Sequence, residues 1–325
     1  MVKKKGFEMS FGLNKKGFEM SFAWLFSIIV GAVIIFLAIY ATTKLVVTEK
    51  TVQNTETAKE FGILLNPVET GLEESKLATV SFPVETVILN DCSTSGDFGR
   101  QGISATSKSN FKADSAGVES GFKNKYIFSE NSVDGKDFEI FSKPFKMPFK
   151  TADVVFLIGN KKYCFVSPST DIEEDIRALK FTGIKTADKV SECDKDSEKV
   201  CFEFSDRECD TEVYSLSKSV KKSGKTEYYD DEFDNSLLWG AIFASPEIYE
   251  CQVQRLMKRT GEISLVYLGK TEYLTAKGCS SNLEEGLNGL EDATKKFKNS
   301  FDLRAVSPIA SELERRNNGL TCKLF

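Results

Sequence analysis

The chain has 325 residues, of which 41% are hydrophobic and 28% are charged, and it contains no histidine. This balance excludes a disordered chain and a multi-span membrane protein, and the missing imidazole excludes Ser-His-Asp and Cys-His nucleophiles. Beyond residue 47 there are 37 basic against 46 acidic residues, a net charge of −9. An acidic chain without a basic stripe repels phosphate backbones, so nucleic-acid binding is excluded as well.

An octapeptide, KKGFEMSF, occurs twice near the N-terminus, at residues 4–11 and 15–22. Lys-Lys-Gly-Phe followed by a long apolar stretch resembles the class III signal of type IV pilins, which a peptidase cuts after the glycine. The resemblance implies a cut between Gly17 and Phe18. It also implies a pilin-like filament subunit or assembly component.

The repeat departs from the pilin pattern at one position. Pilins place a glutamate five residues into the mature chain, where this chain has Phe22, and Glu19 stands second instead. This departure counts against filament assembly. The alternative, which we prefer, is a duplicated basic tail or a start upstream of the true one at Met9 or Met20, whose lysines only determine topology.

Residues 23–47 are expected to form a transmembrane helix. Residues 23–41 carry no charge, and at about 1.5 Å rise per residue they span the roughly 30 Å hydrocarbon core. Trp24 and Tyr40 lie near the two ends, where amphipathic rings favour the membrane interface. The alternative is a cleaved secretory signal, but this apolar run exceeds the usual h-region of about 7–15 residues. We therefore expect a retained signal anchor in the lipid bilayer.

The charges on the two sides of this segment predict its orientation. Five lysines lie in the tail of residues 1–22, whereas the charges just after the span nearly balance. Positive charge stays inside, so we expect a single-pass protein of the cell membrane with a cytoplasmic N-terminus and an extracytoplasmic C-terminal domain.

Cysteine usage supports the same orientation, because all eight cysteines follow the span. An even number in an oxidising compartment predicts four disulfides, and no CxxC motif favours a metal cluster instead. Spacing favours one pairing, Cys193 with Cys201, as a staple across a local hairpin. Cysteines near the C-terminus are expected to tie that part of the chain down. The disulfide candidates are Cys92, Cys164, Cys193, Cys201, Cys209, Cys251, Cys279 and Cys322.

Beyond the span the pattern predicts an α+β, disulfide-stabilised ectodomain. Residues 48–75 are expected to form a juxtamembrane helix or stalk that ends before Asn66-Pro67. Residues 76–168 alternate apolar and polar side chains with period two, which predicts a β-rich subdomain. Residues 169–325 are expected to form an α+β, cysteine-rich subdomain. Aromatic residues on the predicted strands are assigned to the core: Phe128, Phe138, Phe141, Phe145 and Phe149.

Three helices are predicted in the last subdomain. The first begins at a capping box of Thr170 and Glu173. The second has Ser245 as its N-cap and Pro246 in its first position, and Gly261 is expected just past its end. The third follows Ser281 and packs its apolar stripe on its own domain: Leu283, Leu287, Leu290, Phe297 and Phe301.

Candidate chemistry is sparse. The acidic stretch at residues 228–235 offers enough oxygen ligands for a calcium ion but lacks EF-hand spacing, so a solvated acidic loop is favoured. Gly269-Lys270-Thr271 lacks the first glycine of a phosphate loop. We therefore predict no catalytic residue, cofactor or metal and lean against an enzyme, with a histidine-free envelope enzyme using carboxylates as an alternative.

Three longer motifs resemble uncharacterised single-span proteins of archaea with small genomes: SFAWLFSIIVGAVIIFLAIYATTKL, EFGILLNPVETGLEESK and LLWGAIFASPEIYECQVQRLMKR. The resemblance implies an archaeal cell envelope and brings no known activity with it. We accordingly expect a membrane-anchored cell-surface protein with a structural or protein-interaction role. Its expected partners are the bilayer and another envelope protein.

Overall fold

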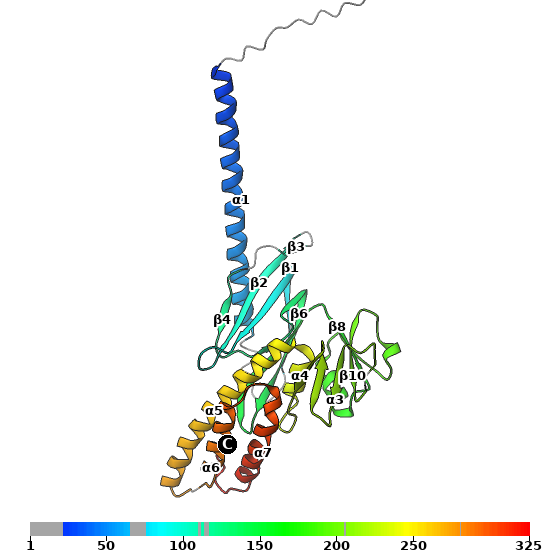
Figure 1. Cartoon of the computed structure of the whole chain (residues 1–325), viewed down its shortest axis with the longest axis vertical. Helices are drawn as coiled ribbons and strands as arrows, with labels where there is room; N and C mark the ends of the chain where they lie inside the picture. Colours follow the sequence, from blue (N-terminus) through cyan, green and yellow to red (C-terminus); the bar gives the residue numbers. More distant parts are fainter. Residues whose placement is uncertain (1–21, 66–75, 110–111, 114–116, 205, 280) are drawn as a thin grey trace, which may run out of the picture. The chain divides into compact units, whose positions relative to one another are not determined.

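A computed structural model describes residues 22–65, 76–109, 112–113, 117–204, 206–279 and 281–325 (Figure 1). The possible processing site at Gly17 and Phe18 lies outside these residues. The chain divides into two compact units, residues 1–49 and residues 50–325.

Helix α1 (Phe22–Leu64) supplies the described part of the first unit. Among the described residues it is the helix that is long and apolar enough to cross a membrane, and its apolar stretch is not covered by protein. Hydroxyl groups within this stretch are satisfied locally: Ser27 and Thr42 donate to carbonyl oxygens one turn earlier, each at 2.8 Å. The segment therefore leaves neither hydroxyl donor unpaired in an apolar surrounding.

The last turns of α1 belong to the second unit. Ala58, Phe61 and Leu65 are completely buried, and the Phe61 ring lies 6.1 Å from that of Phe138 and 6.2 Å from that of Phe82. The helix ends at Leu64, and residues 66–75 of the predicted juxtamembrane segment lie outside the described residues. It is not a free stalk, however, because its apolar side chains complete the core of the ectodomain.

The first sheet is almost entirely antiparallel, and one face of it receives these α1 side chains. Its strand order is β3-β2-β1-β6-β7-β5, and β4 pairs with β2. Only the short β5 runs parallel to its neighbour β7. The strands are β1 (Lys76–Ser93), β2 (Arg100–Ser109), β3 (Lys112–Ala113), β4 (Ser120–Phe122), β5 (Ile127–Phe128), β6 (Ser132–Lys146) and β7 (Lys150–Ile158).

The second sheet is mixed, with the order β13-β12-β11-β10-β8-β9. Its centre is parallel, and helix α3 (Thr170–Leu179) connects the parallel strands β8 and β9. The last two strands return as antiparallel neighbours. The strands are β8 (Lys162–Val166), β9 (Ile184–Ala187), β10 (Ser197–Phe202), β11 (Thr211–Tyr214), β12 (Ser219–Lys222) and β13 (Lys225–Tyr228), and the 3₁₀ turn η1 (Val190–Glu192) precedes β10.

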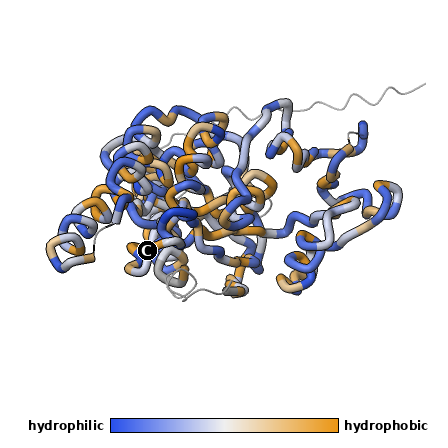
Figure 2. Tube along the Cα trace, turned by 90° about the horizontal axis from the view of Figure 1, so that it is seen from below, coloured by the Kyte–Doolittle hydropathy of each residue, from blue (hydrophilic) through white to orange (hydrophobic). Residues whose placement is uncertain are grey.

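The remaining helices pack with both sheets around one large core, and hydrophobic and hydrophilic residues are mixed along the Cα trace (Figure 2). That core contains side chains from Tyr126 to Leu324, on both sides of residue 168. All five aromatic residues predicted for the core are buried. The helices are α4 (Ser236–Phe243), α5 (Pro246–Ala276), α6 (Glu284–Lys295) and α7 (Leu303–Asn318), with the 3₁₀ turn η2 (Ser300–Asp302) before α7. The predicted α+β class is confirmed, whereas the division at residue 168 stays a prediction.

Two predicted helix boundaries are wrong. Helix α5 does not end at Gly261 but continues to Ala276. A Cβ atom at position 261 would lie 2.5 Å from Oγ1 of Thr294, so this glycine allows the close approach of α5 and α6. The third predicted helix, α6, ends at Lys295, so Phe301 lies outside it in η2 and is half exposed. Helix α3 begins at Thr170 as predicted but has no capping box: its N-cap is Ser169, and Glu173 pairs with Arg177.

Candidate functional site

All eight cysteines are paired in the structure, and three of the four bonds join positions that lie 29 to 159 residues apart in the sequence. Cys92 of β1 is bonded to Cys251 of α5, 159 residues later, so the first sheet is joined to the helices. Cys279 is bonded to Cys322, which fixes the C-terminal segment as expected. No cysteine is free, and the described residues contain no group of side chains that could hold a metal ion.

The pairing predicted from spacing is wrong. Cys193 is bonded to Cys164, and Cys201 is bonded to Cys209. The reason is topological, because β10 does not form a hairpin with the segment before it. It pairs in parallel with β8 and β11, which places Cys201 between strands that no local spacing identifies.

The acidic stretch at residues 228–235 is not a solvated loop, and most of its carboxylates are engaged internally. Asp230 is 6% exposed and accepts a hydrogen bond from Ser307. Asp231 pairs with Lys218 at 2.6 Å. Asp234 accepts from the backbone N–H of Lys146 at 2.9 Å and from that of Ser236 at the start of α4. These contacts give the stretch a structural role.

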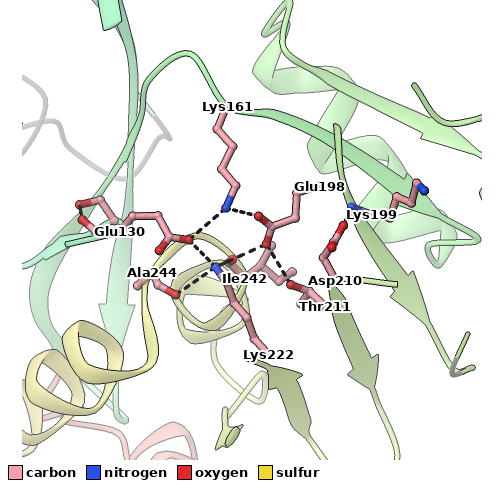
Figure 3. Close-up of polar contacts among 10 residues, drawn as sticks. Glu130, Lys161, Glu198, Lys199, Asp210, Thr211, Lys222, Ile242 and Ala244 are labelled. Atoms are coloured by element: carbon pink, nitrogen blue, oxygen red, sulfur yellow. Dashed lines mark hydrogen bonds and ion pairs between the residues drawn. The ribbon is translucent and has the colours of Figure 1, made fainter. Parts of the chain in front are cut away.

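A second cluster of charges was not recognised from the sequence. Glu130 lies in the turn between β5 and β6, Lys161 in the turn between β7 and β8, Glu198 on β10 and Lys222 at the end of β12 (Figure 3). Two carboxylates and two ammonium groups thus converge where the two sheets meet α4. We call these four residues the charge cluster.

Lys222 is the most central member of the charge cluster. Its ammonium lies 2.7 Å from Glu130 and 3.6 Å from Glu198, and it donates to the carbonyl oxygens of Ile242 and Ala244 at 3.1 and 3.3 Å (Figure 3). These carbonyls lie at the C-terminus of α4, where the helix dipole favours a cation. Lys161 bridges the same two carboxylates from the more exposed side.

The surroundings favour the charged forms of Glu130 and Lys161. Burial alone would raise the pKa of Glu130, but the nearby ammonium groups of Lys222 and Lys161 outweigh it and hold that pKa below its ordinary value. Burial likewise opposes the charge of Lys161, and Glu198 and Glu130 outweigh it, so the pKa of Lys161 is raised. A permanently ionised carboxylate is a poor proton donor and a protonated lysine is a poor nucleophile. The charge cluster is therefore suited to holding the sheets together.

A pocket of about 290 Å³ lies beside the charge cluster. Its floor is formed by Tyr163 and Phe243, both almost completely buried, and its wall carries Glu130, Asp134 and Lys161. Each of these three charged side chains already has an ion-pair partner within the domain. A ligand would have to displace those partners, so the pocket by itself indicates no substrate.

A shallow groove of about 320 Å³ has a different character. It lies between the β11–β12 turn, the end of β13 and the start of α7. Leu216 in that turn is 98% exposed. The exposed guanidinium of Arg304 lies 4.6 Å from the ring centre of Tyr228 and 4.9 Å from that of the half-exposed Phe301. Among the described residues no carboxylate pairs with Arg304, which donates to the carbonyl of Ser217 at 3.3 Å. We call this surface the Arg304 groove.

The sequence did not predict the charge cluster or the Arg304 groove, because the residues that form each of them are far apart along the chain. The one local indication of the groove is Leu216, an apolar residue in an otherwise polar turn. The Gly269-Lys270-Thr271 triplet lies within helix α5, as its incomplete motif indicated. No family model, curated protein or solved structure matches this chain.

Proposed function

We infer that this chain is a secreted or membrane-anchored extracellular protein, because it has an apolar N-terminal helix and a disulfide-rich domain. We propose that this chain is membrane-anchored: a single-pass protein with its N-terminus in the cytoplasm. Its α+β domain is held at the outer surface and contacts another protein of the envelope.

One observation carries the choice of an anchor over a cleaved signal. The helix that contains the apolar segment continues without a break to Leu64 and contributes Ala58 and Phe61 to the core of the ectodomain. A cut near Ala41 would leave Leu45, Val46 and Val47 exposed on the N-terminal helix of a secreted protein. A retained anchor keeps these side chains at the membrane, where they need no protein partner.

The Arg304 groove supports the protein-binding role. Tyr, Phe and Arg side chains are enriched at protein interfaces, and an arginine packed against two adjoining rings keeps its donors oriented. The charge cluster and the four disulfides give this surface a rigid support. The absence of a histidine agrees with binding as the role, although carboxylate catalysis remains an alternative.

Cross-linking of the full chain in intact cells tests this function. The wild type is compared with Arg304→Ala and with Arg177→Ala, a matched loss of an exposed arginine on α3. A partner contact through the groove is lost in Arg304→Ala and kept in Arg177→Ala. Equal cross-linking of the three chains, or recovery of the protein from the medium without its apolar segment, would refute the proposal.

A filament subunit is the second candidate. It rests on Lys16-Gly17-Phe18 and on the long helix α1, whose apolar part is continuous with a folded head. Copies of such a helix bundle together in a filament of this kind. A mature chain that begins at Phe18 would move this candidate to first place.

A further inference from the structure

The C-terminal half of α5 carries apolar side chains on its outer face as well as on the face that packs on its own domain. Val266 is 71% exposed and Tyr273 is 63% exposed. On the inner side of the same stretch Ser264 and Thr271 are completely buried, and Ile263, Tyr267, Leu268 and Leu274 pack against the core. A contiguous exposed apolar surface marks an interaction site, whereas single exposed apolar residues are normal, so the spacing of these side chains decides between the two.

The exposed residues follow the spacing of a helix–helix seam. Glu262, Val266, Gly269, Tyr273 and Ala276 are four, three, four and three residues apart, which places them along one face of the helix. All five are exposed. A Cβ atom built on Gly269 would meet nothing within 4 Å, so the middle of this face is flat and open. We call these five residues the α5 seam.

The α5 seam is complementary to itself. If two copies pack antiparallel about the point between Gly269 and Lys270, each residue lies opposite the one at the same distance on the other side of that point. Val266 then lies opposite Tyr273 of the second copy, and the exposed Glu262 lies opposite the exposed Lys277. Twofold symmetry makes each of these contacts twice.

The charges that surround this contact do not oppose it. Lys270 donates its ammonium to the carbonyl of Leu324 at 2.6 Å, which draws it away from the centre of the seam. Lys277 lies over the ring of Tyr273, 5.7 Å from its centre, and therefore borders the same face. Lys295, the nearest cation to Glu262 on α6, is paired with Glu291.

We propose that the α5 seam is a dimerisation surface whose occupant is the α5 seam of a second copy of this chain. A contact of four helical turns is smaller than the roughly 1,200–2,000 Å² that stable complexes bury, so it is weak between free domains. Two chains tethered in one membrane have a much higher effective concentration. The tighter dimerisation in the membrane rests on the proposed anchor, whereas the contact between the two α5 seams does not.

Charge reversal tests the register of the dimer. Full chains with donor and acceptor labels are reconstituted in phospholipid vesicles, and energy transfer is measured against surface density. Glu262→Lys and Lys277→Glu each turn two attractive pairs across the seam into two like-charged pairs and should weaken the dimer about tenfold. The double variant restores both pairs and should recover the wild-type curve.

Glu285→Lys, a matched reversal at an exposed position on α6, should leave the curve unchanged. Transfer no greater than that of randomly distributed chains, or a double variant as weak as the single ones, would overturn the proposal. If the chain proves to be secreted, the same four variants are compared by sedimentation at high concentration. A failed anchor and a failed dimer are thereby told apart.

Discussion

The ammonium of Lys222 lies 2.7 Å from a carboxylate oxygen of Glu130, although 92 residues separate the two in the chain. This pair and its neighbours join the turn after β5 to the end of β12 and to α4. Because Lys222 and Glu198 are almost completely buried, neither charge can turn to water if its partner is lost. The two sheets are thus joined by a contact that tolerates little change.

Lys222→Met should therefore destabilise the protein strongly. It keeps most of the apolar stem but leaves the carboxylates of Glu130 and Glu198 without their central cation, which costs about 3–5 kcal/mol of unfolding free energy for a buried pair. Urea unfolding of the full chain measures this. The control is Lys162→Met, which breaks an exposed pair with Asp196 and should cost no more than about 1 kcal/mol. Equal losses of unfolding free energy in the two variants would show that the charge cluster stabilises the protein no more than an exposed ion pair does.

Gly261→Ala should weaken the packing of α5 on α6. The added methyl group meets Oγ1 of Thr294 at 2.5 Å, and overpacking of this kind costs about 1–3 kcal/mol. Thr294→Ala removes that oxygen and should relieve the clash in the double variant. Gly289→Ala, where nothing lies within 4 Å, should instead stabilise α6 by about 0.5–1 kcal/mol. Thermal unfolding distinguishes these outcomes, and a stable Gly261→Ala chain would contradict the close approach.

Stability should fall as the pH rises towards neutrality because of Glu227. Burial and the nearby charge of Glu250 raise the pKa of Glu227 from 4.5 to about 7, and its Oε2 has no hydrogen-bond partner. Between these two values the folded state binds a proton that the unfolded state has lost, so the unfolding free energy decreases with pH there and levels off above about 7. After allowance for solvent screening the loss is on the order of 2 kcal/mol.

Glu227→Gln removes this titration. The variant should be more stable than the wild type at pH 8, and the difference should shrink to zero as the pH falls towards 4.5. Denaturant unfolding of both chains at several pH values measures the difference. Parallel profiles would show that Glu227 ionises normally in the folded protein.

The disulfide between Cys92 and Cys251 should matter more than the one between Cys201 and Cys209. The first closes a span of 159 residues and the second a span of 8, so loop-closure entropy predicts losses of about 5 and about 2.5 kcal/mol respectively when each pair is replaced by alanine. Peptide mapping without reduction checks the pairing independently. A peptide that links Cys193 to Cys201 would contradict the topology of the second sheet.

Sequence patterns within a single helix or strand predicted the features that depend only on neighbouring residues. The period-two runs identified the strands that carry Phe138 and Phe141, and Ser245 with Pro246 identified the start of α5. The end of α5 was missed because Gly261 is ambiguous in sequence. A glycine can end a helix or let two helices approach, and only Thr294 on a different helix decides which.

The site features depend even more on long-range topology. Glu198 and Lys222 are ordinary strand residues until the order β12-β11-β10 brings them together beside Glu130. The partner of Cys193 depends in the same way on the parallel pairing of β8 with β10, because Cys164 lies on β8. Helix α4 was not predicted because every one of its residues is buried, so it shows no amphipathic period.

The retained anchor is the central claim, and the intact mass and N-terminal residue of the mature protein test it most directly. The protein is taken from its native membrane and from the medium. We predict a membrane-bound chain that begins at or before Met20 and therefore contains the whole apolar part of α1. A soluble chain that begins after Ala41 would contradict the anchor and show that the apolar segment is a cleaved signal.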